Sequence, residues 1–368
     1  MIYRLFGDEA AARRAAEDIR VEQTVEFPYR ALPDGTIRDE VTGRIESFDE
    51  EKEGTYLAEI SFADETAAGE LTQFLNVAFG NISIKRGIQI AGFIPGEGIL
   101  SLCPGPRFGV SGIRKLTGVA ERPMIFSALK PMGLSSADLA GLAWKLAEGG
   151  VDVIKDDHGL TNQVFAPFEE RVACCAEAVR EANARFGRSA IYVPNVTAPA
   201  GLVMKRARKA LECGAGGLLI APGIAGFGAM LELAASDMDL PVFAHPALMG
   251  SYAINRDGIE PAALFGTLMR IFGADVTIFP NHGGRFPLTK EECLGIARAC
   301  REKLGNLGSI FPSPAGGIEF SNIAELVGNY GNDFLLLAGG GLFTCGEDLV
   351  SNCNKFHDEV LKASSNLI

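Results

Sequence analysis

From Pro123 onward the chain alternates short apolar segments with stretches of helical character. There are eight apolar segments, and successive ones begin 24 to 39 residues apart. Near-continuous apolar runs are typical of parallel strands that are covered on both faces. Eight strand–helix units over about 220 residues match the length of a (β/α)8 barrel, and the pattern therefore predicts that fold. The segments are residues 123–130, 151–157, 190–196, 216–222, 241–247, 274–280, 309–315 and 333–341.

An open, doubly wound sheet is the alternative arrangement for the same pattern. It would be favoured by a G-x-G-x-x-G phosphate-binding turn near the first strand, and that turn is absent from the sequence. Polar residues instead gather where the apolar segments end, which is where barrel enzymes keep their active sites. We therefore predict an α/β chain in which residues 111–368 form a TIM barrel with a C-terminal helical segment.

Residues 1–110 have a different pattern, which predicts a smaller N-terminal α+β domain of the ferredoxin-like kind. Three segments have strand character: residues 21–27, 55–62 and 88–94. Between the first two, residues 32–51 are polar and rich in turn-forming residues. A helix is predicted over residues 65–77, with Asp64 as its N-cap.

The composition restricts the class of partner and the compartment. The net charge is −12 and the pI is near 5.0, which argues against binding to nucleic acid or to an anionic membrane. The N-terminus has neither a secretory apolar core nor an acid-poor transit pattern. The eight cysteines include no Cys-x-x-Cys pair, as expected for reduced thiols of a cytoplasmic protein.

Ionisable residues stand at the ends of several predicted strands. Lys155, Asp157 and His158 end the second strand, and alternation places Lys155 and Asp157 on the same side. One such cluster has an ordinary explanation, a Lys–Asp ion pair beside a solvated histidine. Lys130 and His245 end two further strands in the same way. Lysine, aspartate and histidine converging at one barrel mouth indicate a proton-abstraction site with a divalent metal.

Five motifs in the chain resemble, in the same order, those of the RuBisCO superfamily. They are SALKPMGLS (127–135), GGVDVIKDDH (149–158), FAHPA (243–247), PAGGI (314–318) and LAGGGLF (337–343). The resemblance covers nearly the whole chain, although KPMGLS is one residue shorter than the usual form. It implies a small α+β domain followed by a barrel, and active sites that form between two subunits. A homodimer is therefore expected, in which Asn81 of one subunit reaches the site of the other.

The resemblance also assigns roles by position. Lys155 matches the lysine that reacts with CO₂ to form a carbamate, which would bind Mg²⁺ together with Asp157. His158 stands where RuBisCO has a glutamate, so it is the ligand that departs from the family pattern. Lys130 matches the lysine that moves protons on the substrate enediol. His245 matches the histidine of strand five, and we predict that it takes part both in catalysis and in substrate binding.

Several family residues are missing, and their loss argues against CO₂ fixation. Met132 replaces a second lysine of the family, and Pro246 replaces an arginine that binds a phosphate. The flexible lysine after strand six is absent from residues 279–286, and the small domain's glutamate motif is not found between residues 30 and 50. The chain thus resembles a RuBisCO-like protein.

One phosphate site is predicted by glycine pairs that follow strands seven and eight, the usual phosphate position in barrels. Glycine lets backbone N–H groups approach an anion closely. The pairs are Gly316–Gly317 and Gly339–Gly340. Arg285 and His282, after strand six, have two equal interpretations: contacts to the substrate, or a solvated loop.

The pocket has one predicted phosphate site, and Met132 and Pro246 would make its other end less cationic and more apolar. These features favour a sugar monophosphate with an apolar tail as the substrate. The resemblance points to isomerases of 5-methylthioribulose 1-phosphate, which shift a carbonyl through an enediolate. Enolases of 2,3-diketo-5-methylthiopentyl 1-phosphate and decarboxylases of a phosphorylated 3-oxo sugar acid are alternatives, because they need similar residues. A regulator without catalytic activity is the non-enzymatic alternative, and the retained lysines and Asp157 argue against it.

Overall fold

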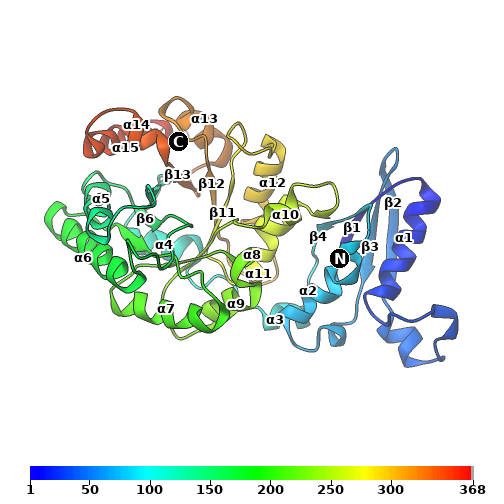
Figure 1. The fold of residues 1–368 in the computed structure, drawn as a ribbon. Coiled ribbons are helices and arrows are strands. Elements are labelled where there is room, and N and C mark those ends of the chain that lie inside the picture. Colours follow the sequence, from blue (N-terminus) through cyan, green and yellow to red (C-terminus); the bar gives the residue numbers. More distant parts are fainter. Residues whose placement is uncertain (366–368) are drawn as a thin grey trace.

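The computed structural model describes residues 1–365 and contains two sheets (Figure 1). The first sheet has five strands, in the order β10-β4-β1-β3-β2. Its four N-terminal strands follow the chain order β-α-β-β-α-β with all pairings antiparallel, which confirms the predicted ferredoxin-like domain. The fifth strand is short, pairs parallel to β4, and comes from the segment between the fifth and sixth strands of the barrel. The elements are β1 (Ile2–Phe6), α1 (Glu9–Glu22), β2 (Arg44–Lys52), β3 (Thr55–Ser61), α2 (Leu71–Phe79), β4 (Ile88–Gly92) and β10 (Gly258–Ile259).

Several details predicted for this domain were wrong. Residues 21–27 form no strand, because the alanine-rich helix α1, capped by Asp8, continues through residue 22. The stretch 32–51 contains most of β2, an edge strand with a largely exposed surface and therefore little apolar alternation. The predicted helix 65–77 is a short 3-10 turn, Asp64–Ala67, followed by α2, whose N-cap is Glu70. Strand β1 was missed.

The second sheet is the predicted eight-stranded parallel barrel. Its order β7-β6-β5-β13-β12-β11-β9-β8 brings the two outer strands together, where an Asn195–Leu219 bridge joins them. The Val196 N–H donates to the Leu219 carbonyl at 2.9 Å. All eight predicted segments contain a strand. The strands are β5 (Met124–Leu129), β6 (Val153–Asp156), β7 (Ile191–Val193), β8 (Leu218–Ile220), β9 (Val242–Ala244), β11 (Val276–Pro280), β12 (Phe311–Ala315) and β13 (Leu335–Leu337).

Helices surround the barrel on its outside (Figure 1). The longer ones are α5 (Ser136–Glu148), α6 (Phe168–Phe186), α7 (Ala200–Glu212), α9 (Phe227–Ala235), α12 (Lys290–Ala299), α13 (Ile323–Tyr330) and α15 (Leu349–Ser365). A π-helical segment, η5 (Ala262–Leu268), continues into α11 (Met269–Ile271). The shorter helices are α3 (Glu97–Leu102), α8 (Pro222–Ala225), α10 (Gly250–Ala253) and α14 (Gly340–Thr344). None of the helices within residues 1–365 is both long and apolar enough to cross a membrane.

Helix α4 (Gly109–Thr117) closes the N-terminal end of the barrel. Its Ile113 packs in the same apolar cluster as the side chains that fill the barrel interior. The Asp275 carboxylate, just before β11, accepts the Phe108 and Gly109 N–H groups at 2.7 and 2.8 Å and holds this helix in place. The barrel therefore opens at the carboxyl ends of its strands.

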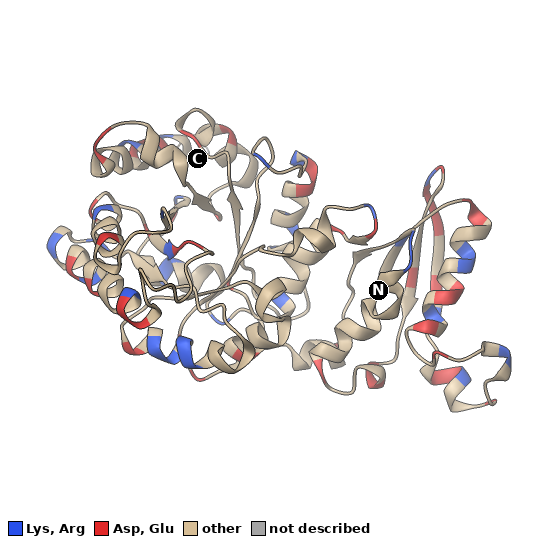
Figure 2. Ribbon diagram, in the orientation of Figure 1, with Lys and Arg blue, Asp and Glu red and all other residues tan. Residues whose placement is uncertain are grey.

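Charged residues lie on the outside of the molecule, and the barrel interior is apolar. Figure 2 shows acidic and basic residues interspersed along the outer helices and on α1 and β2. The barrel interior is lined mainly by β-branched and aromatic side chains, among them Phe126, Val153 and Phe243. Lys155 continues this inward row after Val153, which places a lysine at the top of an apolar interior.

Candidate active site

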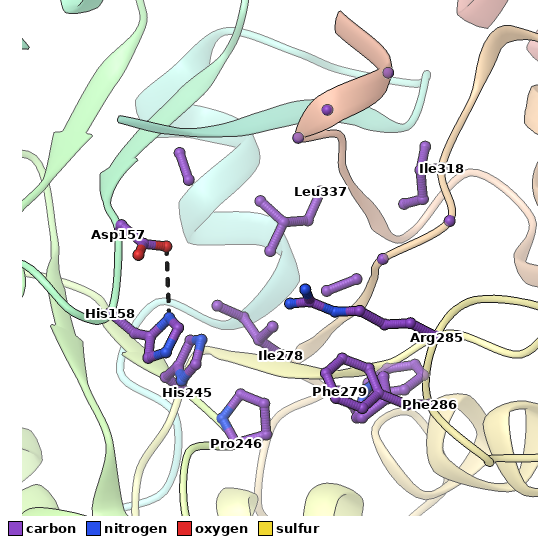
Figure 3. A pocket seen from close by; sticks show the side chains of 18 of the residues that line it. Asp157, His158, His245, Pro246, Ile278, Phe279, Arg285, Phe286, Ile318 and Leu337 are labelled. Carbon is purple, nitrogen blue, oxygen red and sulfur yellow. Dashed lines mark ion pairs between the residues drawn. The ribbon is translucent and has the colours of Figure 1, made fainter. Parts of the chain in front are cut away.

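A cavity of about 1230 Å³ lies at the carboxyl ends of the barrel strands. Its walls come from β5, β6 and β9 and from the loops after β11, β12 and β13. Figure 3 shows Asp157, His158 and His245 on one side and Arg285 extending into the cavity from another. Of the predicted site residues, the lining contains Lys130, Lys155, Asp157, His158, His245, Arg285, Gly316, Gly317, Gly339 and Gly340.

Lys155 is 2% exposed and stands next to Ala128 of β5. Its Nζ donates to the backbone carbonyl of Asp156 at 3.0 Å. Burial lowers the pKa of Lys155 to about 8, against the opposing effect of the nearby Asp157 charge. With this pKa roughly a tenth of the amine is uncharged at pH 7, far more than for an ordinary lysine, and the uncharged amine is the form that acts as a nucleophile.

Asp157 is the anionic centre of the cavity. Its Oδ1 lies 3.2 Å from Lys130 Nζ and 3.4 Å from His158 Nδ1. Burial alone would raise the pKa of Asp157. The hydrogen bond with His158 and the charges of Lys155 and Lys130 outweigh that effect and hold the pKa well below its usual range. Asp157 is therefore a carboxylate at all physiological pH values.

His158 and His245 stack face to face, with ring centroids 4.5 Å apart and planes 12° from parallel (Figure 3). Burial, together with the charges of Lys155 and His158, lowers the pKa of His245 well below 6.5, so its ring is neutral. The Ala247 N–H donates to His245 Nδ1 at 3.1 Å. Because Nδ1 is the acceptor, the neutral ring carries its proton on Nε2 and can donate a hydrogen bond there.

A buried polar network lies behind this cluster, and the sequence interpretation missed it. Asp156 alternates outward from Lys155, and its carboxylate receives Arg171 Nε at 3.2 Å and the Tyr192 hydroxyl at 2.7 Å. Both members of the Arg171–Asp156 pair are 0% exposed. Asn195 donates to the backbone carbonyls of His158 and Leu160 at 2.8 and 3.0 Å. The network fixes the backbone on both sides of Asp157.

The glycine-rich part of the cavity comes from the loops after β12 and β13. Gly316 and Gly317 have φ values of +90° and +68°, which favour glycine. Gly340 is in the first turn of α14, and a Cβ there would meet nothing within 4 Å. Neither conformation nor packing requires glycine at that position, so its small size leaves open space and accessible backbone at the cavity wall.

Asn81, His282 and Met132 do not belong to the described lining of the cavity. Asn81 is exposed on the N-terminal domain and donates to Glu22 Oε1 at 3.2 Å. His282 Nε2 lies 3.5 Å from Glu325 Oε1. The roles expected of Asn81 and His282 stay predictions. Met132 and Pro246 were expected to make the far end of the pocket less cationic and more apolar; Pro246 lines the cavity, whereas Met132 is 49% exposed with its Cε close to Gly159.

The cavity also contains apolar residues that sequence reasoning did not single out. Leu248, Ile254 and Phe286 line it and are largely exposed. Leu248 and Ile254 follow β9, and Phe286 follows Arg285. No sequence signal distinguishes them from other loop residues, because loops commonly contain single exposed apolar side chains.

No group of three His, Cys, Asp or Glu side chains with metal-binding spacing occurs in the part of the chain that the structure describes. The fit to Mg²⁺ therefore depends on Lys155. As an amine, Lys155 supplies no oxygen ligand, and Mg²⁺ prefers oxygen. As a carbamate it would add anionic oxygens beside Asp157, and only then do these residues suit a hard divalent cation.

The fold and the site define a barrel protein with a lysine–aspartate cluster at its mouth, and comparison with known proteins identifies the family. Residues 109–348 match the family described as "Ribulose bisphosphate carboxylase large chain, catalytic domain". This chain belongs to that family, as the motifs predicted.

Relatives with assigned names include proteins that are not carboxylases. Ribulose bisphosphate carboxylase-like protein 1 of Rhodopseudomonas palustris is 40% identical over 96% of this chain and 94% of its own length. The 5-methylthioribulose-1-phosphate isomerase of Rhodospirillum rubrum is 35% identical over 99% of this chain and 96% of its own. A 2,3-diketo-5-methylthiopentyl-1-phosphate enolase of Microcystis aeruginosa is 32% identical over 80% and 75%.

Solved structures agree with the fold. The crystal structure of a Rubisco-like protein from Rhodopseudomonas palustris superimposes with a TM-score of 0.89 at 38% identity, covering 98% of this chain and 97% of that one. The two-domain architecture of this chain is thus the architecture of RuBisCO-like proteins.

Proposed function

We propose that this protein is a Mg²⁺-dependent isomerase of 5-methylthioribulose 1-phosphate that works through an enediolate. The observation that carries the proposal is the convergence of Lys130, Lys155 and Asp157 in one cavity that also has a glycine-rich wall. The isomerase relative supports the choice of reaction, because it aligns over 99% of this chain at 35% identity.

Each part of the cavity would act on a different part of the substrate. The glycine loops and Arg285 would bind the phosphate, since accessible N–H groups and a guanidinium suit its oxygens. Arg285 lines the cavity with its guanidinium 4.9 Å from the centroid of the Phe286 ring, a contact that leaves its N–H groups able to donate to a phosphate. His245 would donate its Nε2 hydrogen to a substrate oxygen.

The reaction requires proton transfers at two neighbouring carbons and between their two oxygens. Lys130 or the Lys155 carbamate would take the proton from the carbon beside the carbonyl, and the electron pair would move onto the carbonyl oxygen. Return of a proton to the former carbonyl carbon, together with transfer of a proton from the neighbouring hydroxyl to the former carbonyl oxygen, would complete the shift of the carbonyl. Mg²⁺, when bound near Lys155 and Asp157, would supply Lewis-acid stabilisation of the negative oxygen.

Incubation of 5-methylthioribulose 1-phosphate with the protein in D₂O tests the reaction. We expect Mg²⁺- and bicarbonate-dependent product formation with deuterium at the carbon that receives the proton, detected by NMR. The Lys130→Met variant distinguishes the two candidate bases: it should incorporate no deuterium if Lys130 takes the proton, and it should still exchange if the Lys155 carbamate does. If the wild-type protein gives neither product nor exchange, the proposal is wrong.

The enolase reaction is the second candidate, because relatives of that name align with this chain at 32% identity or more. It uses the same proton abstraction and the same phosphate. An NMR product assay with the isomerase substrate, the enolase substrate and a phosphorylated 3-oxo sugar acid separates these reactions. Metal-dependent turnover of any of the three would exclude a purely regulatory protein.

The metal site has a separate test. With bicarbonate present, isothermal calorimetry should detect Mg²⁺ binding to the wild-type protein but not to Lys155→Ala, and this variant should lose activity. In His158→Glu an oxygen ligand replaces the imidazole, so Mg²⁺ binding should be retained. Wild-type turnover by Lys155→Ala would contradict the assignment.

We also propose a homodimer in which Asn81 serves the partner's site. Its exposed position on the N-terminal domain, away from the cavity of its own chain, is what this role requires. Mixing Asn81→Ala subunits with Lys155→Ala subunits should restore activity, because one of the two shared sites then carries neither substitution. No recovery after demonstrated subunit exchange would mean that each chain supplies its own site.

A further inference from the structure

The turn that follows β9 places a leucine where the backbone favours glycine. The Met249 N–H donates to the Pro246 carbonyl at 3.0 Å, so Leu248 is the third residue of a four-residue turn. Its φ is +68°, in the left-handed region. Glycine and asparagine adopt this conformation in turns with little strain, whereas a leucine is strained there. The fold itself gives no reason for leucine at this position.

Packing does not explain the leucine either. Leu248 is 60% exposed, whereas the next residue, Met249, is 1% exposed and anchors the turn in the core. The side chain of Leu248 lines the active-site cavity. A strained backbone and an exposed apolar side chain are both unfavourable for the isolated chain, and both occur at the cavity wall. Strain of this kind is found at functional sites.

A second exposed apolar side chain of the segment after β9 lines the same cavity: Ile254, just after α10, is 45% exposed. Phe286, in the loop after β11, lies instead under the Arg285 guanidinium, 4.9 Å from ring centroid to Cζ, on the side assigned to the phosphate. The glycines belong to the loops after β12 and β13, at other positions around the barrel. The same turn that carries Leu248 also holds His245, through the Ala247 N–H. An apolar group bonded to the reacting part of a substrate would therefore come close to Leu248.

We propose that Leu248 is a specificity-determining residue that contacts the methylthio end of the substrate, with Ile254 of the same segment after β9 lining the cavity as well. The inference rests on the proposed function, because the methylthio group is the apolar end of that substrate. The phosphate is bonded to the opposite end of the carbon chain, so the two ends leave the reacting carbons in different directions. Covering a thioether with apolar side chains removes both from water.

The test compares Leu248→Asn with Leu248→Met. Asparagine has nearly the size of leucine and tolerates positive φ, but its amide is polar; methionine keeps an apolar side chain. The substrates are 5-methylthioribulose 1-phosphate and ribulose 1-phosphate, which has a hydroxyl in place of the methylthio group. Leu211→Asn, on the outer helix α7, is a control for replacing an exposed leucine far from the cavity.

We expect Leu248→Asn to have an unchanged or higher Tm, because the turn is relieved of strain. Its kcat/KM for the methylthio substrate should fall by about 10- to 100-fold, the range for losing a small apolar contact in a pocket, and that for ribulose 1-phosphate should change by less than about threefold. Leu248→Met and Leu211→Asn should keep the wild-type preference. Wild-type preference in Leu248→Asn would overturn the inference.

Two further outcomes are decisive. If Leu248→Asn changes the oligomeric state in light scattering, a second subunit covers Leu248 and the inference is wrong. If the wild-type protein does not isomerise the methylthio substrate, the proposed function fails, and calorimetric binding of the two sugar phosphates then tests Leu248 alone. A loss of affinity in Leu248→Asn confined to the methylthio compound would still support its role, and equal affinities would refute it.

Discussion

Replacing the buried Lys155 with methionine should make the ligand-free protein more stable while abolishing its activity. The pKa of Lys155 is lowered by burial from 10.5 to about 8. Since one pKa unit corresponds to about 1.36 kcal/mol, the charged lysine destabilises the folded state by roughly 3 kcal/mol at pH 7. The pKa of about 8 already includes the attraction to Asp157, so the loss of the 3.0 Å hydrogen bond to the Asp156 carbonyl is what offsets part of the gain. We expect Lys155→Met to gain roughly 1–3 kcal/mol.

The stability gained by Lys155→Met should depend on pH, and the lowered pKa of Lys155 determines the direction. Between pH 8 and pH 10.5 the unfolded chain still binds the lysine proton and the folded chain has released it, so the stability of the wild-type protein rises with pH. Below about pH 8 the destabilisation is complete. The advantage of Lys155→Met should therefore be full at pH 7 and should disappear as the pH approaches 10.5.

Urea unfolding of the two proteins at pH 7 and pH 10, without Mg²⁺ or bicarbonate, measures this difference. Lys130→Met is the matched control: Lys130 has a side chain that is 47% exposed, so its loss should change stability by less than about 1 kcal/mol. Added Mg²⁺ and bicarbonate should then stabilise the wild-type protein and not Lys155→Met. A variant that is no more stable at pH 7, or a difference that is independent of pH, would refute the reasoning.

Three further predictions concern the surrounding structure. Arg171→Met should lower the free energy of unfolding by about 3–5 kcal/mol, measured in urea, because it leaves Asp156 buried without its cation; a loss below 1 kcal/mol would show that the pair contributes little. Gly317→Ala should raise KM for the phosphorylated substrate at least about tenfold, because its Cβ would lie 3.0 Å from Gly284 Cα at a φ of +68°. Gly340→Ala should leave Tm unchanged and still raise KM, since its Cβ meets only open space; an unchanged KM would mean that no ligand approaches this residue.

The barrel could be predicted from the sequence because its strands are buried on both faces. An apolar segment such as 274–280 is recognisable without any knowledge of its neighbours. The N-terminal domain offered weaker signals. Strand β2 lies at a sheet edge, and its sequence RIESFDEEK is dominated by charged residues, so only its pairing with β3 identifies it as a strand. Pairing of this kind is not visible in composition or periodicity.

Among the residues around the cavity, some could likewise be predicted from the sequence and others could not. Alternation along β6 was enough to place Lys155 and Asp157 on the inner side. The same rule turns Asp156 outward, but its partner Arg171 is on a helix 15 residues later, and nothing in the sequence links the two. The positive φ of Leu248 is likewise a property of the folded turn, because leucine does not favour this conformation by itself.

The short strand β10 has a consequence for how this chain can be divided. Gly258 and Ile259 lie more than 140 residues after the end of the first domain's own strands, yet they cover the outer edge of β4. A fragment cut near residue 110 would leave that edge with unpaired N–H and carbonyl groups, which promote association between sheets. Residues 1–110 expressed alone should therefore aggregate more readily than the full chain, unless an added strand covers the same edge.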